Sequence, residues 1–158
     1  MFEKLIEFFH NPHSYETPMP QADVDHVVGA LMVRAAKADR AYLFEEVETI
    51  DRVLIERHDL NALEAAKMRA ACEKLEENMP NTAELTAVLR DTVGMPELEN
   101  VLRILWRVVL ADGIELEVED EVLHRVEALL GVTADRAKEL HDEIVEERLS
   151  KNLTVQTG

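Results

Sequence analysis

The sequence predicts an all-α protein of about seven helices, built from a helix–turn–helix unit that occurs twice. Three observations support this prediction. Aromatic residues are only 4% of a chain that is 47% hydrophobic, so leucine, valine, isoleucine and alanine must form the core, and leucine and alanine are strong helix formers. Apolar side chains recur at helical spacing along most of the chain. A short acidic stretch appears twice, each time between an apolar run and an acidic amphipathic one.

The helices can be placed in order from their apolar spacing and from residues that begin or end helices. Asn61 and Glu64 have the spacing of a capping box, with asparagine as the N-cap. Pro96 stands where proline is favoured in the first turn, and Gly94 and Gly131 suit helix C-termini. The helix that Pro96 begins is apolar on nearly every side, which indicates a central, buried position. The predicted helices span residues 21–38, 43–58, 61–75, 85–93, 96–111, 118–130 and 133–149.

The body of the chain, residues 21–149, is predicted to form one α-helical domain. We expect residues 1–20 to form a short amphipathic helix and a proline-containing linker arm, and residues 150–158 to form a flexible tail. The start of the chain lacks the pattern of a signal peptide. The longest apolar run, residues 101–111, contains two arginines and is too short to span a bilayer. A cytoplasmic protein without a transmembrane segment is therefore expected.

The chain carries a formal net charge of −16, from 33 acidic and 17 basic residues. Charge of this sign repels nucleic acid and anionic lipid, and it favours cations or the basic surface of a protein partner. Solubility alone is the other explanation. The single cysteine, Cys72, builds no disulfide framework and falls within a helical pattern. We expect it to be a packing residue in a reducing compartment.

An internal repeat becomes visible when the chain is shifted by 73 residues, which aligns residues 31–54 with residues 104–127. The apolar positions keep the same periodicity, and the next helix starts in register if one residue is skipped. The identical pairs are Arg34/Arg107, Ala38/Ala111, Asp39/Asp112, Leu43/Leu116, Glu46/Glu119, Glu48/Glu121, Arg52/Arg125 and Val53/Val126. Two units, about residues 21–78 and 96–149, are predicted to pack about a pseudo-two-fold axis.

Each unit contains one copy of the acidic stretch, here called the first acidic turn (residues 38–46) and the second acidic turn (residues 111–119). The second reads Ala-Asp-Gly, five residues, Glu. On a helix–turn–helix, this pattern resembles the TerB-like family, which includes tellurite-resistance TerB proteins and the N-terminal-type domain of DjlA co-chaperones. The first turn departs from the pattern because Arg40 replaces the glycine. The resemblance covers about residues 21–149 and implies an all-α bundle with internal duplication, and a role in tellurite or metal stress involving divalent cations.

Asp39, Glu46, Asp112 and Glu119 are the candidate cation ligands of the two turns. Ligands that offer only oxygen favour a hard ion such as Mg²⁺ or Ca²⁺. An EF-hand is excluded because apolar residues stand where the loop after Asp112 would need carboxylates. Since glycine adopts a left-handed turn without strain, any cation site is expected to be better formed in the second turn.

A structural interpretation of the same residues stays open. Each aspartate can accept backbone N–H groups across its turn. Each glutamate stands three residues after a leucine at the N-cap position, and can accept that leucine's backbone N–H as half of a capping box. Arg34 and Arg107 are the predicted ion-pair partners of the acidic residues.

Few patterns point to a reaction. Glu121 and His124 have the Glu-x-x-His spacing of di-iron bundles, and Asp23 with His26 only loosely repeats it. The sequence contains no Gly-rich phosphate loop, nucleophile elbow or Cys/His array. We therefore expect a non-enzymatic protein that presents its acidic turns to a divalent cation or a basic partner. The alternative is a helical protein–protein interaction module in which the repeat is purely structural.

Overall fold

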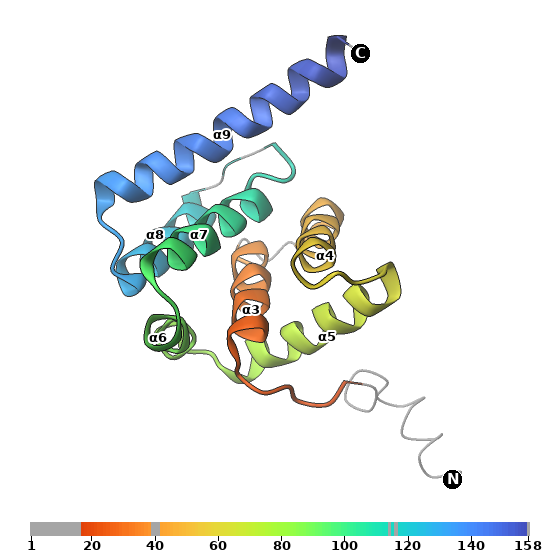
Figure 1. Cartoon of the computed structure of the whole chain (residues 1–158), viewed down its shortest axis with the longest axis vertical. Coiled ribbons are helices and arrows are strands. Elements are labelled where there is room, and N and C mark those ends of the chain that lie inside the picture. Colours follow the sequence, from red (N-terminus) through yellow and green to blue (C-terminus); the bar gives the residue numbers. More distant parts are fainter. Residues whose placement is uncertain (1–16, 39–41, 114, 116, 158) are drawn as a thin grey trace.

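The computed structural model describes residues 17–38, 42–113, 115 and 117–157, with side chains as far as Asn152. Every regular element within these residues is an α-helix, which confirms the all-α prediction (Figure 1). The helices, labelled as in Figure 1, are α3 (Val24–Ala36), α4 (Phe44–His58), α5 (Ala62–Asn78), α6 (Thr82–Thr92), α7 (Met95–Val109), α8 (Glu117–Leu130) and α9 (Ala134–Thr157).

Several helices begin at polar side chains that satisfy the backbone N–H groups of the first turn. Asp23 Oδ1 accepts the N–H of His26 at 2.9 Å at the start of α3. The predicted capping box at the start of α5 is confirmed. There, Asn61 Oδ1 accepts the N–H of Glu64 at 2.8 Å, and Glu64 Oε1 accepts the N–H of Asn61 at 3.0 Å.

The C-terminal end differs from the prediction. A flexible tail was expected from residue 150, whereas α9 continues to Thr157, and the flexibility of this end stays a prediction. No proline or glycine interrupts the chain between residues 149 and 157, so nothing local ends the helix. Arg148 also donates to the backbone oxygen of Ala111 at 2.8 Å and thereby ties α9 to the end of α7. Residues 1–16 of the predicted arm lie outside the described residues, and the chain has no helix from residue 17 to residue 23.

The helix boundaries reproduce the repeat. A shift of 73 residues carries the end of α3 onto Val109, where α7 ends, and the start of α4 onto Glu117, where α8 begins. A shift of 72 residues carries the start of α5 onto Ala134, where α9 begins. Helices α3, α4 and α5 thus form the first unit and α7, α8 and α9 the second, with α6 as the connection.

The two units pack through their first helices, α3 and α7, at the centre of the molecule (Figure 1). Within each unit, this first helix contacts the other two. Between units, α4 contacts α7 as α8 contacts α3, which is the exchange that a pseudo-two-fold axis produces. The central helices account for much of the hydrophobic core, and Trp106 of α7 is its largest fully buried side chain.

Close packing of α3 on α5 depends on Gly29. A Cβ atom at this position would lie 2.1 Å from the Sγ of Cys72, so no other residue fits without displacement. Cys72 is fully buried, as expected of a packing residue. The repeat-equivalent of Gly29 in α7 is Leu102, so the two units are not packed alike.

Two leucines with helical spacing do not face the core. Leu63 and Leu149 share helical spacing with other apolar residues of α5 and α9, but they are 66% and 57% exposed. Leu63 lies in the first turn of α5 and Leu149 in the outer part of α9. Periodicity identifies the apolar face of a helix, but it does not show how far the neighbouring helix extends to cover that face.

Candidate functional site

The first acidic turn is described only in part. Asp39 and Arg40 lie outside the described residues. Glu46 is 2% exposed, and its Oε1 accepts the backbone N–H of Leu43 at 3.0 Å. The predicted half capping box is confirmed here, so this glutamate has a structural role at the start of α4.

The second acidic turn follows α7 directly. Gly113 has a φ of 82°, in the left-handed region where glycine is favoured, and its N–H donates to the oxygen of Leu110 at 3.0 Å. Asp112, the residue before it, is partly exposed. Glu119, in the first turn of α8, is as buried as Glu46, at 2% exposure. Its equivalent N-cap leucine lies outside the described residues, so a matching half capping box stays a prediction.

The two arginines repeated between the units have other partners among the described residues. Arg34 lies 3.7 Å from Glu76 and donates to the backbone oxygens of Glu76 and Met79 and to the hydroxyl of Thr82. Arg107 forms a bidentate pair with Glu147 of α9, at 2.9 and 3.2 Å. Both arginines face the third helix of their own unit, whose position the alignment does not give. Their pairing with the acidic turns stays a prediction.

A small pocket lies beside the second acidic turn, between α7, α8 and α9. Its volume is about 230 Å³. The turn contributes Glu115, whose Oε1 lies 2.6 Å from Nε2 of His141 on α9. The His141 ring meets Trp106 edge to face, with 4.5 Å between the ring centroids. The indole Nε1 of Trp106 is buried and has no hydrogen-bond partner among the described residues.

Two further acidic residues of α8 line the same pocket. Glu127 is 6% exposed and its Oε2 lies 3.0 Å from Nδ1 of His124. Asp120 shares a hydrogen bond with Glu115. Burial, followed by this hydrogen bond, raises the pKa of Asp120 to about 6, because two carboxylates in contact disfavour a second negative charge.

The same contacts change the pKa values of Glu115 and His141. Burial favours neutral Glu115, but hydrogen bonds from His141 and Asp120 outweigh it and lower the pKa of Glu115. Burial likewise favours neutral His141, but its hydrogen bonds to Glu115 and Asp142 outweigh burial and raise its pKa. Below about pH 6 the pocket therefore holds a proton between two carboxyl groups, next to a histidine whose charged form is favoured.

The described residues contain no group of three or more His, Cys, Asp or Glu side chains arranged to hold a metal ion. The Glu-x-x-His pattern gains no support, because His124 is exposed and interacts with Glu127, while His26 interacts with Asp23 at the start of α3. Burial raises the pKa of Cys72 to about 12, so its thiol is not a nucleophile at neutral pH.

Sequence reasoning identified the turn but missed most of the pocket beside it. Asp120, Glu127 and His141 lie on α8 and α9 at positions that look like ordinary solvent-exposed faces of amphipathic helices. The one available signal was Glu115 within the turn itself. His141 comes from a helix more than twenty residues further along the chain, and only the packing of α9 against α7 brings it to Glu115.

The fold and the two turns define a class: all-α proteins with an internal duplication and one acidic turn in each half. The family model described as "Tellurite resistance protein TerB" matches residues 26–142, which begin in α3 and end in α9. The chain therefore belongs to the TerB family, and the match spans both units and both acidic turns. No curated protein and no solved structure matches the chain. No helix in the described part of the chain is both long enough and apolar enough to cross a bilayer.

Proposed function

We propose that this chain is a non-enzymatic TerB-family protein of the tellurite and metal-stress response, and that its second acidic turn binds a divalent cation, Mg²⁺ or Ca²⁺. The observation that supports the proposal is the group of carboxylates around Gly113, which has a left-handed backbone conformation and lies within the region that the family model matches. Asp112 precedes the glycine, and Glu115 and Asp120 follow it in hydrogen-bonding contact with each other.

The absence of a preformed three-residue metal group in the described residues is compatible with Mg²⁺ in particular. This ion gives up its water reluctantly, so proteins often hold it through one or two carboxylates while water fills the other positions. A cation at Glu115 and Asp120 would replace the proton that these carboxyl groups share. The buried Nε1 of Trp106, which lacks a described partner, offers a hydrogen bond to an oxygen atom in the same pocket.

The test is a thermal melt of chelator-treated protein with and without Mg²⁺ or Ca²⁺. At about ten times the dissociation constant, a single bound ion stabilises the fold by about 1.4 kcal/mol, a rise of several degrees in Tm. We expect Asp112→Asn to reduce that rise. Asp91→Asn is the matched control, because Asp91 is an exposed aspartate at the end of α6, away from both turns. A wild-type Tm that neither ion changes would refute the cation site.

One observation favours the second candidate, a protein–protein interaction module in which the repeat is structural. Glu46 is buried and holds the N–H of Leu43, so in the first turn the repeated glutamate supports the helix start and is shielded from solvent. On this alternative, a protein partner with a basic surface would bind the acidic exterior of the chain. The Tm would then be the same with and without divalent ions, and Asp112→Asn would behave like Asp91→Asn.

A further inference from the structure

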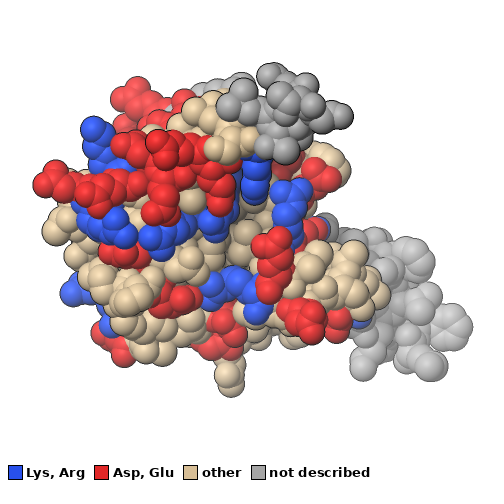
Figure 2. All heavy atoms as spheres, turned by 45° about the horizontal axis from the view of Figure 1, so that its top comes forward, with Lys and Arg blue, Asp and Glu red and all other residues tan. Residues whose placement is uncertain are grey.

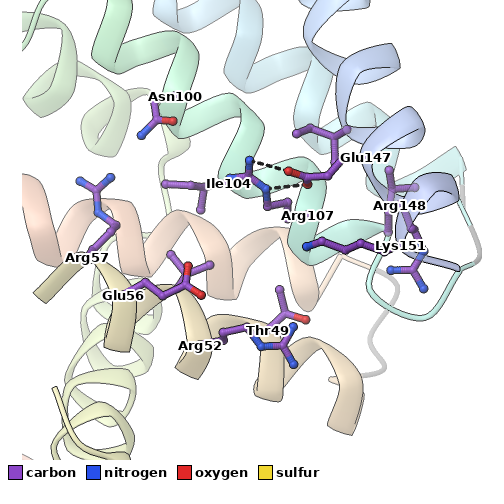
Figure 3. A pocket seen from close by; sticks show the side chains of 13 residues that line it. Thr49, Arg52, Glu56, Arg57, Asn100, Ile104, Arg107, Glu147, Arg148 and Lys151 are labelled. Carbon is purple, nitrogen blue, oxygen red and sulfur yellow. Dashed lines mark hydrogen bonds and ion pairs between the residues drawn. The ribbon is translucent and has the colours of Figure 1, made fainter. Parts of the chain in front are cut away.

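A larger pocket than the one beside the second acidic turn lies in the groove between α4, α7 and α9. Its volume is about 440 Å³, within the range of small-molecule sites. Figure 3 shows Arg52 on α4, Arg107 on α7 and Lys151 on α9 along this groove, with Lys151 reaching from α9 toward α4.

The same groove in the other half of the molecule is filled. Under the pseudo-two-fold axis, the groove between α4 and α7 corresponds to the groove between α8 and α3, and there α6 packs against both helices. The start of α6 also covers Arg34, the equivalent of Arg107, because Arg34 donates to Thr82. No helix in the described residues covers the groove that holds Arg107, so this groove remains open.

The open groove differs in chemistry from the filled one. In the other half, Leu129, Leu130 and Leu75 stand at positions whose repeat-equivalents in the open groove are charged. Those equivalents are Glu56, Arg57 and Glu147. A groove with these residues does not suit an apolar helix like α6, because the charges would lose their hydration without gaining partners.

Positive charge is concentrated in the open groove. Five of its thirteen lining residues are basic and two are acidic, a local charge of +3 on a chain of net charge −16. The basic residues are Arg52, Arg57, Arg107, Arg148 and Lys151. On the face of the molecule shown in Figure 2, many carboxylates gather in one area, and several basic side chains lie next to them.

The basic residues of the groove are not all occupied by protein partners. Arg107 is paired with Glu147, Arg57 lies 3.0 Å from Glu97, and Arg148 uses one N–H group on a backbone oxygen. Arg52 makes no hydrogen bond or ion pair with the other described residues. The charge of Lys151 helps to lower the pKa of Glu147, but the two side chains form no hydrogen bond or ion pair. Free donors thus remain at the end of the groove where Arg52, Arg148 and Lys151 lie (Figure 3).

We infer that this groove is a binding site for a small organic phosphate. The phosphate would lie among Arg52, Arg148 and Lys151, since guanidinium and ammonium groups are the side chains that best hold a dianionic oxygen cluster. The carbon part would lie against Ile104 and Ile144, which line the groove beyond that end. The inference uses none of the carboxylates of the cation site, although Arg148 also donates to the backbone oxygen of Ala111 in the second acidic turn.

The negative charge of the whole chain does not prevent such binding. At physiological salt the screening length is about 8 Å, so the groove's own charges determine the local potential more than carboxylates on remote faces. The long-range field does slow the approach of an anion, so we expect a modest association rate and a marked dependence on salt.

The test is calorimetric titration of the full chain with phenyl phosphate, inorganic phosphate and phenol at low salt. We expect phenyl phosphate to bind with a dissociation constant of about 1 mM or below, and both fragments about tenfold more weakly. Arg52→Gln is expected to weaken phenyl phosphate binding about tenfold. Arg125→Gln is the matched control, because Arg125 is the repeat-equivalent of Arg52, is equally exposed on α8 and does not line the groove.

Because Arg52 has no partner among the described residues, we expect Arg52→Gln to leave the fold intact, and a thermal melt of the variant checks this. A change in binding can then be distinguished from a loss of folding. Weakening by Arg52→Gln, but not by Arg125→Gln, supports the site. Equal weakening by both variants would show a nonspecific charge effect and overturn it. Inorganic phosphate binding as tightly as phenyl phosphate would overturn the organic part of the inference, and no heat with any of the three probes would overturn all of it.

Discussion

The two halves of this molecule share a helix order, eight aligned identities and one inter-helix groove, yet they treat that groove differently. In one half, α6 packs against both helices of the groove and buries its apolar Leu85 and Leu89. In the other half, the groove is an open cavity of about 440 Å³ with basic and acidic walls. A duplicated unit preserves the positions of helices, while individual side chains determine whether the space between helices becomes core or site.

The pair Arg34 and Arg107 shows this difference at a single repeated position. Arg34 has 13% of its side chain exposed and is held by backbone oxygens and Thr82 at the junction of α5 and α6. Arg107 is 35% exposed and faces the open cavity. The same residue in the same register is a structural clamp in one half and part of a candidate binding surface in the other.

The largest effect is expected from Gly29→Ala, which tests the close packing found only in the first half. The new Cβ atom would meet Cys72 Sγ at 2.1 Å, so we expect a loss of about 3 kcal/mol in the free energy of unfolding, measured by urea denaturation. Adding Cys72→Ala should recover part of the loss because it removes the sulfur atom. A loss below about 1 kcal/mol for the single variant would contradict the tight contact.

The next effect compares the repeated arginines directly. Arg34→Met should lower the free energy of unfolding by about 2 kcal/mol, because it leaves two half-buried backbone oxygens without their donor. Arg107→Met should lower it by about 0.5 kcal/mol, because its pair with Glu147 is more than one-third exposed. Methionine keeps the apolar stem in both variants. Equal losses in urea denaturation would show that the two halves use this arginine alike.

A smaller effect is expected at the start of α4. Glu46→Ala removes the acceptor for the N–H of Leu43 and should lower the free energy of unfolding by about 1 kcal/mol. Glu46→Gln keeps a carbonyl oxygen at that place, so it should retain most of the stability. Glu119→Ala tests whether the second half uses the same contact. A much larger loss there would indicate a different role for Glu119.

The smallest effect concerns pH. The pKa of Asp120 is raised from 3.8 to about 6 in the folded chain, so the fold binds a proton that the unfolded chain has already lost. The resulting stabilisation is complete below pH 3.8 and disappears as the pH rises through about 6. Because Asp120 is only partly buried, solvent screens its interactions, and we expect a change of about 1 kcal/mol or less.

Asp120→Asn should flatten that part of the pH dependence, measured as urea denaturation between about pH 4 and pH 7. The raised pKa of His141 acts in the same direction, because a charged histidine stabilised by Glu115 loses its proton as the pH rises. The variant should therefore keep a residual slope. A pH profile identical to that of the wild type would contradict the shared proton between Glu115 and Asp120.

Much of the fold could be predicted from local signals. The capping box at Asn61 and the register of the two units follow from side chains within a few residues of each helix end. The candidate site was harder to predict. Of its predicted ligands, Glu46 turned out to be buried at a helix start, Asp39 lies outside the described residues, and the acidic partners Asp120 and Glu127 were missed.

By itself, the sequence determined the helical class, the duplication and the two acidic turns, because helix periodicity, capping and glycine conformation are local properties of the chain. Only the tertiary structure decided what those features face. In the tertiary structure, α6 occupies one groove and the other stays open. Arg34 faces backbone oxygens at the end of α5, whereas Arg107 faces the open cavity. The physical reason is that burial and charge pairing depend on neighbours far along the chain, and their positions are not encoded within any single repeat.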